Sequence, residues 1–397
     1  MKRPAIVHFI AIHTEDHLHI KTSLTIKYVP DESNKKIPFA KEVTKTIARE
    51  MELPRKASFP IQAFRLLRGR SFSIKVIAFD NERNSLFTKV YESDSVGAFN
   101  FKIPLLKEYK ELKTLQIFEV SQTPGLDIIL GSFIPLVINN PKKIVICDFD
   151  KTLVDTRYST TKDVYKSLTK PIHYFPTVTN SVALLKSYIE QGFHPFILSA
   201  SPHFYEDAMR DWLYQNHIYT AGVFLKDYRH IFNFLELDLT PKDLKVQGMY
   251  KLNHLLDILL MVGVPDELIL MGDNFESDPI IYLALCALLR EEMDPWKFTN
   301  FLGGLYSFQM NKKQKARLLS KSYQIASTLG QWNKDRNRQV NIKIYIRKKV
   351  LEDKIVVPEI LEKNLPLLEL YDGLTLMIEA PFLNKDHGRS EENNKAD

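Results

Sequence analysis

The segment KIVICDFDKTLVDT (residues 143–156) decides the fold that this sequence predicts. It begins with a continuous apolar run, which is typical of a strand buried on both faces of a parallel sheet. Two carboxylates, Asp148 and Asp150, follow directly at alternate positions. Neighbouring carboxylates repel one another, and burying either of them needs a compensating cation, so packing alone does not explain the pair. The segment therefore predicts a buried strand that ends in a reactive site.

After this segment, apolar strands alternate with helical patterns. Helices are predicted at residues 181–192, 202–216 and 250–263, and further strands at 194–200, 222–228 and 268–272. Such alternation predicts an α/β fold with a Rossmann-like, doubly wound parallel sheet. In sheets of this kind, ligands bind beyond the carboxyl ends of the strands. The residues that follow each strand are therefore the ones to inspect for chemistry.

Two of these strands also end in polar residues. The strand at 194–200 leads to Ser199 and Ser201, and the strand at 268–272 leads to Asp273 and Asp278. Lys251 opens the helix between them. Because the carboxyl ends of parallel strands meet at one edge, the aspartates should gather there and repel one another. A hard divalent cation would resolve this repulsion, and oxygen ligands at this density suit Mg²⁺.

The first 140 residues read as mostly β. Residues 71–79, 85–91 and 99–103 alternate apolar and polar side chains, with polar turns between them. Short strands at such spacing predict an antiparallel sandwich, while residues 40–53 have helical periodicity. The predicted domains are a β-rich, sandwich-like domain at 1–140, an α/β domain at 141–350 with a helical insertion at about 284–335, and a C-terminal extension at 351–397, disordered from about 385.

Composition restricts the class of protein. The chain of 397 residues, 45% hydrophobic and 26% charged, has the composition of a soluble globular protein. No apolar run approaches the ~20 residues that a membrane-spanning helix needs, and no signal peptide is predicted. Cys147 and Cys286 are the two cysteines, both in apolar segments, which favours a reducing compartment and hence the cytoplasm. The net charge of +6 suits anionic substrates without requiring nucleic acid, and the sequence does not indicate an oligomeric state.

The polar strand ends resemble the haloacid dehalogenase superfamily over residues 142–283. Asp148, Asp150 and Thr152 match its first motif, DxDxT, and Ser199 matches the end of the second motif strand. Lys251 matches the lone lysine of the third motif, and GDNFESD (272–278) matches the acidic fourth motif. The resemblance implies a Mg²⁺-dependent phosphatase. About 45 residues separate the first two motifs and about 50 more precede Lys251, which leaves no room for a large cap domain.

The resemblance also implies a role for each residue. Asp148 would attack phosphorus and form an aspartyl-phosphate. Asp150 would protonate the leaving oxygen and later deprotonate the attacking water. The implied metal ligands are Asp148, Asp150 through its carbonyl, Asp273 and Asp278. The implied phosphate-binding residues are Thr152, Ser199, Ser201 and Lys251.

Further motifs resemble one branch, the phosphatidate phosphatases of the actin-patch-protein type. The Ser-Ala-Ser-Pro run at 199–202, the Asp-Pro-x-x-Tyr run at 278–282 and the strand at 341–350 match this family, as does a β-rich region before the nucleophile. The chain departs from the family at Lys151, where an acid is usual, at Asn274 and Phe275, and at His203. The resemblance implies a phosphatidate-like lipid as substrate, and the departures leave substrate choice open.

Other readings stay open at this point. The enzyme could act on a soluble or protein phosphoester, or the fold could serve a non-catalytic binding protein, although an intact Asp148 and Asp150 pair argues against the latter. A basic run at 312–321 could draw a peripheral protein to anionic lipid head groups, or could be a solvated helix face. An open site suits a membrane-borne phosphoester, unless residues 284–335 or the β-rich region close over it.

Overall fold

The computed structural model describes most of the chain. The described residues are 2–28, 70–105, 109, 111–120, 125, 127–156, 172, 175–202, 205–219, 221–226, 247–274, 277–305, 308, 310–336, 339–348 and 355–371. The helix predicted at 40–53, His203 and the tail beyond 385 lie outside these residues, as do most of the segments in which a cap would be inserted. Within the described residues, no helix is both long and apolar enough to cross a membrane.

The N-terminal part is mostly β, as predicted, and its described residues form two four-stranded sheets. One sheet has the order β5-β2-β1-β8 and contains β1 (Lys2–His13), β2 (His17–Tyr28), β5 (Ala98–Pro104) and β8 (Leu136–Val137). The other has the order β4-β3-β6-β7 and contains β3 (Ser73–Phe79), β4 (Ser85–Glu92), β6 (Thr114–Glu119) and β7 (Ile128–Phe133). Neighbouring strands are antiparallel except β1 and β8. Inward residues of both sheets, such as Ile20 and Val76, share one core.

The C-terminal part is built on a parallel sheet. Its described strands follow the order β11-β10-β9-β12-β13-β14. They are β9 (Lys143–Asp148), β10 (His194–Pro202), β11 (Gly222–Lys226), β12 (Glu267–Asp273), β13 (Asn341–Arg347) and β14 (Leu368–Tyr371). Every pair of neighbours is parallel. The residues of β9 after Lys143 are buried throughout, as its apolar run predicts for a central strand.

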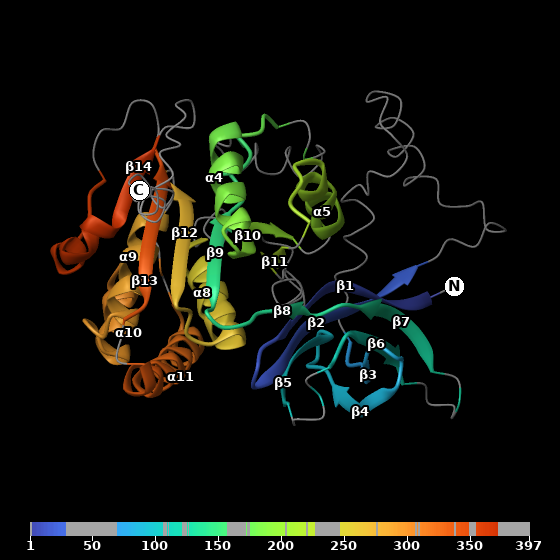
Figure 1. Ribbon diagram of the computed structural model, residues 1–397. Helices are drawn as coiled ribbons and strands as arrows, with labels where there is room; N and C mark the ends of the chain where they lie inside the picture. The colour runs from blue at the N-terminus through green and yellow to red at the C-terminus, as the bar shows by residue number, and fades with distance from the viewer. Residues whose placement is uncertain are drawn as a thin grey trace, which may run out of the picture.

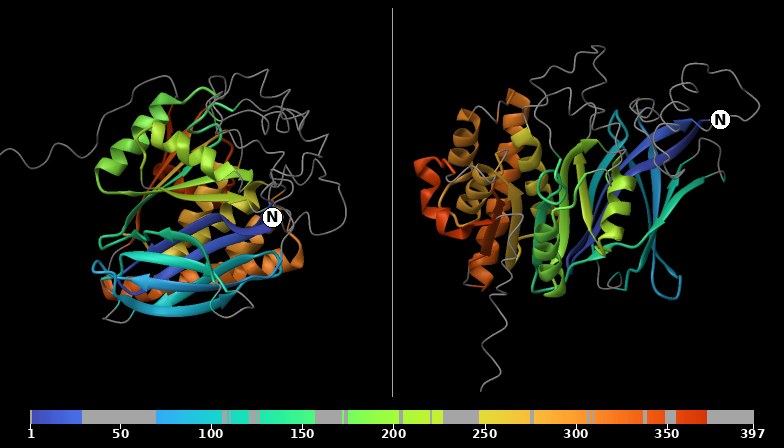
Figure 2. Two further views of the ribbon diagram at one scale, coloured as in Figure 1. Left: turned by 90° about the vertical axis from the view of Figure 1, so that its right-hand side faces the viewer. Right: turned by 90° about the horizontal axis from the view of Figure 1, so that it is seen from above.

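Helices cover both faces of this sheet (Figures 1 and 2). The helices are α4 (Thr179–Glu190), α5 (Glu206–Gln215), α8 (Gln247–Val262), α9 (Asp278–Leu289), α10 (Pro295–Gly304) and α11 (Lys312–Arg336), with a 3₁₀ helix, η6, at Glu359–Leu367. Val145 and Cys147 of β9 pack in the core with α4 and α5, whereas Ile144 and Ile146 pack with α8 and α9. Successive side chains of a strand point to opposite faces of the sheet, so the residues of β9 alternate between the two cores.

The strand order places a topological switch point beside β9. From β9 the chain moves outward through β10 to β11, and then returns to the other side of β9 for β12. The helix after β9 and the helix after β12 lie on opposite faces, because α4 and α9 belong to different cores. Adjacent strands whose connections leave on opposite faces open a crevice at their carboxyl ends, where ligands of α/β sheets bind. Asp148 and Asp273 end these two strands.

The two parts of the chain meet along the hairpin of β1 and β2. Ile10 and Ile12 of β1 pack in the same core as α8 and α9. Lys21 of β2 forms an ion pair with Asp257 of α8 at 2.7 Å. The domain boundary predicted near residue 140 stays a prediction. So does the boundary at 350, although the parallel sheet continues past it into β14.

Helices α10 and α11 occupy the segment predicted as a helical insertion. They lie at the amino ends of the strands, below the sheet in Figure 1. Lys142, which directly precedes β9, and Trp332 of α11 line one groove there. These helices therefore lie at the opposite end of the sheet from Asp148.

Candidate active site

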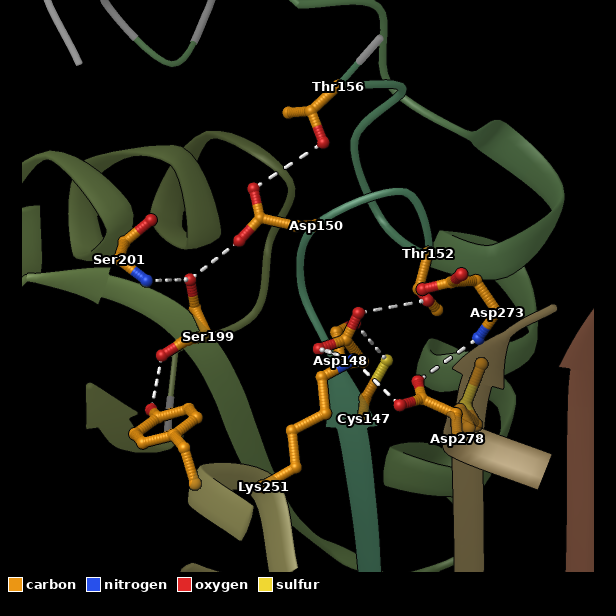
Figure 3. Close-up of polar contacts among 12 residues, drawn as sticks. Cys147, Asp148, Asp150, Thr152, Thr156, Ser199, Ser201, Lys251, Asp273 and Asp278 are labelled. Carbon is orange, nitrogen blue, oxygen red and sulfur yellow. Dashed lines mark hydrogen bonds and ion pairs between the residues drawn. The ribbon is translucent and has the colours of Figure 1, made fainter. Parts of the chain in front are cut away.

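Three buried carboxylates converge at the carboxyl end of β9 (Figure 3). Asp148 ends β9, Asp273 ends β12 and Asp278 begins α9, and an oxygen of each lies within 4.8 Å of the other two. None of the three residues is more than 1% exposed. The parallel register explains this meeting. Met271 of β12 pairs with Cys147 of β9, so the carboxyl ends of the two strands lie side by side.

Lys251 of α8 is buried among these carboxylates. Its Nζ lies 2.7 Å from Oδ1 of Asp278 and 3.0 Å from Oδ1 of Asp148, and the residue is 2% exposed. A lysine is almost never buried to this extent unless it is paired. On the other side, the backbone N–H of Asp273 donates to Oδ2 of Asp278 at 3.3 Å. Gly272 permits this approach, because a Cβ at that position would lie 2.5 Å from the same oxygen.

The donor set fits a divalent cation. Three buried carboxylates lie close together, and Lys251 pairs with two of them. Burying uncompensated charge costs several kcal/mol per ion. Carboxylate oxygens are the ligands that Mg²⁺ and Ca²⁺ prefer. The arrangement of Asp148, Asp273 and Asp278 is thus one that a hard divalent cation would stabilise.

Asp150 has a different environment from Asp148, although one residue separates them. Its side chain turns toward β10, where the Ser199 hydroxyl donates to its Oδ2 at 2.7 Å (Figure 3). The Thr156 hydroxyl lies 3.5 Å from its other oxygen. The backbone N–H of Ser201 donates in turn to the Ser199 hydroxyl oxygen at 3.0 Å. Of Asp148 and Asp150, the first is therefore fully buried and the second half-buried, and the two have separate partners.

The turn after β9 sets these two directions. Lys151 has φ of 60°, in the left-handed region that non-glycine residues seldom adopt. After it, the hydroxyl of Thr152 donates to Oδ2 of Asp148 at 3.4 Å. The carbonyl of Phe149 accepts from the N–H of Leu153 at 2.9 Å, which closes the turn. The Phe149 ring packs edge-on against Trp212 of α5, with centroids 5.0 Å apart.

Two ionisable side chains beside the carboxylates stay neutral. Burial, together with the charge of Asp148, raises the pKa of the Cys147 thiol well above its ordinary value. Burial, together with Asp278, does the same to the pKa of Tyr282, whose hydroxyl donates to the carbonyl of Met271 at 3.0 Å. Neither group supplies a charge or a nucleophile to the site at neutral pH.

The structure brings the predicted site residues together in two adjacent groups. Asp148, Thr152, Lys251, Asp273 and Asp278 form the first group, and Asp150, Ser199 and Ser201 form the second. The Ser199 hydroxyl, predicted to bind phosphate, contacts Asp150 here. The roles of these residues stay predictions.

Sequence reasoning missed three residues that support the site. The Tyr250 hydroxyl donates to the carbonyl of Ser199 and to that of Phe224. Thr156 contacts Asp150, and Arg347 at the end of β13 donates to the carbonyl of Lys151. Arg347 could have been found, because it lies in the second half of a predicted strand, and the carboxyl ends of the neighbouring strands carry the other site residues. Nothing in the sequence distinguishes Thr156 from an ordinary turn residue.

One family model matches the central part of the chain. Residues 143–293 match the model of a family described as "Phosphatidate phosphatase APP1, catalytic domain". The family resemblance predicted from the sequence is confirmed. The matched range contains every site residue predicted above. No curated protein matches the chain.

Several solved structures show a distant likeness to the chain. They include a calcium-binding mutant of Bacteroides uniformis beta-glucuronidase 2 (9% identity, 87% of this chain and 33% of that chain, TM-score 0.23). They also include Parabacteroides merdae beta-glucuronidase (11% identity, 87% and 34%, TM-score 0.24) and a glycosyl hydrolase family 2 member from Bacteroides cellulosilyticus (10% identity, 86% and 42%, TM-score 0.23). This chain spans about a third of the length of the first two. At these TM-scores, the likeness carries no information on the fold or function of this chain.

Proposed function

We propose that this protein is a Mg²⁺-dependent phosphatase of phosphomonoesters, with a phosphatidate-like lipid as its favoured substrate. The observation that carries the proposal is the buried cluster of Asp148, Asp273 and Asp278 around Lys251, at the carboxyl ends of two adjacent parallel strands. The family match supports a phosphatase of this kind. The parallel sheet with helices on both faces is compatible with a fold of the haloacid dehalogenase type, which we include in the proposal.

In the first step, Asp148 attacks phosphorus and forms an aspartyl-phosphate as the bond to the leaving oxygen breaks. Lys251, 3.0 Å from Oδ1, and Thr152, 3.4 Å from Oδ2, fix the plane of the attacking carboxylate. Asp148, the Asp150 carbonyl, Asp273 and Asp278 would hold Mg²⁺, which would supply positive charge next to the transferring phosphoryl group.

Asp150 moves the protons. It gives a proton to the leaving oxygen in the first step, and takes one from the water that hydrolyses the aspartyl-phosphate in the second. Its hydrogen bonds with Ser199 and Thr156 hold it apart from Asp148, so the two carboxylates can differ in protonation. Ser199, Ser201, Thr152 and Lys251 then bind the phosphoryl oxygens, where fixed donors stabilise developing charge.

The lipid preference rests on the family match and not on the basic helix. Exposed Lys312, Lys313 and Arg317 belong to α11, at the amino ends of the strands, away from Asp148 (Figure 1). A membrane drawn to that helix would face the wrong end of the sheet. The alternative substrate is a soluble or protein phosphoester. We propose a cytoplasmic protein that associates with membranes at their surface.

Purified protein tests the enzymatic proposal directly. With Mg²⁺ it should release phosphate from an aryl phosphate, with a chelator it should not, and Asp148→Asn should reduce kcat by more than about 10³-fold, as loss of a nucleophile does. Asp211→Asn, an exposed aspartate on α5, is the matched control and should keep full activity. Equal turnover by Asp148→Asn and the unsubstituted protein would refute the mechanism. Absence of turnover in both, with Mg²⁺, would refute the enzyme itself.

A second comparison separates the substrates. Initial rates on phosphatidate in phosphatidylcholine vesicles are compared with rates on soluble phosphomonoesters and on a phosphopeptide. A higher kcat/KM on vesicles supports the lipid substrate. A higher value on either of the others supports the alternative.

A further inference from the structure

Arg347 connects the two loops that carry the site. It ends β13, and its side chain, 16% exposed, reaches the turn after β9. There its Nη1 donates to the backbone carbonyl of Lys151 and lies 3.6 Å from Oδ1 of Asp155. Its own carbonyl accepts from the N–H of Asn274, which follows Asp273, at 3.0 Å. One residue of a neighbouring strand thus contacts the loops after both β9 and β12.

The contact falls on the strained residue of the turn. A left-handed backbone is unfavourable for a residue that carries a Cβ, and Lys151 has φ of 60°. Strained residues of this kind persist when their surroundings hold them in place. A guanidinium that donates to the carbonyl of the same residue is a charge-assisted hydrogen bond, stronger than a neutral one. Arg347 therefore favours the conformation that turns Asp150 toward Ser199 while Asp148 faces Lys251.

We propose that Arg347 is a positioning residue for the general acid and base, Asp150. It acts through the backbone of Lys151, and its contact with Asp155 steadies the far side of the same turn. This inference rests on the proposed function, because it assigns Asp150 the proton-transfer role. Arg347 would influence the step in which the leaving oxygen needs a proton more than the attack by Asp148.

Leaving-group dependence tests this directly. A nitrophenolate leaves without a proton, whereas an alkoxide requires one, so misplacing the acid slows alkyl esters selectively. We expect Arg347→Met to reduce kcat on glycerol phosphate by about 100-fold, and on nitrophenyl phosphate by less than about 10-fold. Arg347→Lys keeps one donor for the carbonyl. Its kcat on glycerol phosphate should therefore lie between those of the unsubstituted protein and Arg347→Met. Lys343→Met, which removes a cation from the same strand, should leave both rates unchanged.

Hydrogen exchange gives a readout that needs neither metal nor substrate. In metal-free protein, amides of residues 149–156 should exchange about 10-fold faster in Arg347→Met, because the turn loses its anchor. Amides of β10 should be unaffected. Should Arg347→Met fail to fold, Arg347→Lys carries both comparisons with smaller changes.

The outcomes separate this inference from the proposed function. Equal slowing of both esters, or unchanged exchange of residues 149–156, would overturn the role of Arg347. If the unsubstituted protein has no phosphatase activity, the proposed function fails and the acid-positioning role fails with it. The exchange experiment then still decides whether Arg347 anchors the turn.

Discussion

Replacing Asp148 by asparagine should stabilise the metal-free protein. The change removes the ion pair with Lys251 at 3.0 Å, and also removes the repulsion from Asp273 and Asp278, whose oxygens lie within 4.8 Å. At an effective dielectric constant of about 20, the ion pair contributes about 5.5 kcal/mol, and each repulsion at least about 3.5 kcal/mol. For these three interactions alone, the balance is a gain of about 1.5 kcal/mol in the free energy of unfolding. A nucleophile that lowers stability is typical of functional sites.

Urea unfolding measures this gain. Asp148→Asn and the unsubstituted protein are compared at pH 8 in a chelator, and again with Mg²⁺. With Mg²⁺, the difference in stability between the two proteins should become smaller or change sign. A bound ion stabilises the protein with all three carboxylates more than it stabilises Asp148→Asn. Lys251→Met should instead lose about 3–5 kcal/mol in the chelator, since it leaves the buried carboxylates without their counter-charge.

One result would refute this reasoning. If Asp148→Asn is less stable than the unsubstituted protein in the chelator, while the exposed control Asp211→Asn is unchanged, the buried carboxylates do not repel one another as charged groups. The site would then be an ordinary stabilising ion-pair network, and the need for a metal would lose its physical basis.

Three further predictions concern the surroundings of the site. Gly272→Ala should lower stability by about 1–3 kcal/mol in thermal unfolding, because its Cβ would lie 2.5 Å from the Asp278 carboxylate. Burial lowers the pKa of His17 to about 4, from 6.5, so the unfolded chain binds more protons between these values and stability falls as the pH drops through that window, by up to about 3 kcal/mol. Urea unfolding at pH 7.5 and 4.5 measures this loss, and His17→Gln should reduce it. A double-mutant cycle of Lys21→Met and Asp257→Asn, read by urea unfolding, should give a coupling energy of about 1–3 kcal/mol for their 2.7 Å ion pair, and a value near zero would contradict the contact.

The sequence was sufficient to predict the meeting of Asp148 and Asp273. An apolar run identifies β9 and β12 as buried strands, and the parallel register then brings their ends together. The direction of Asp150 could not be predicted in the same way. It depends on the left-handed backbone of Lys151, which a lysine seldom adopts and which Arg347 favours from about 200 positions further along the chain.

The N-terminal hairpin was harder to read for a related reason. Strand β1 buries polar His8 and His13 among its apolar residues, which obscures the alternation of a strand. His8 is accommodated because its Nδ1 lies 2.7 Å from Glu206, 198 residues away. The short strand β14 likewise owes its place to pairing with β13. Patterns in a local window cannot register partners at such distances.

The packing of β1 against the α/β core has a consequence for biosynthesis. Ile10 and Ile12 pack against core residues of α8 and α9. Lys21 pairs with Asp257, which lies 236 residues further along the chain. A ribosome adds residues N-terminal first, so the hairpin emerges well before the helix that covers it. The face that carries Ile10 and Ile12 has to wait, exposed or shielded by a chaperone, until α8 has been made. Contacts at this separation also slow folding. Shortening this waiting time, for instance by circular permutation that places α8 ahead of β1, should raise the yield of folded protein.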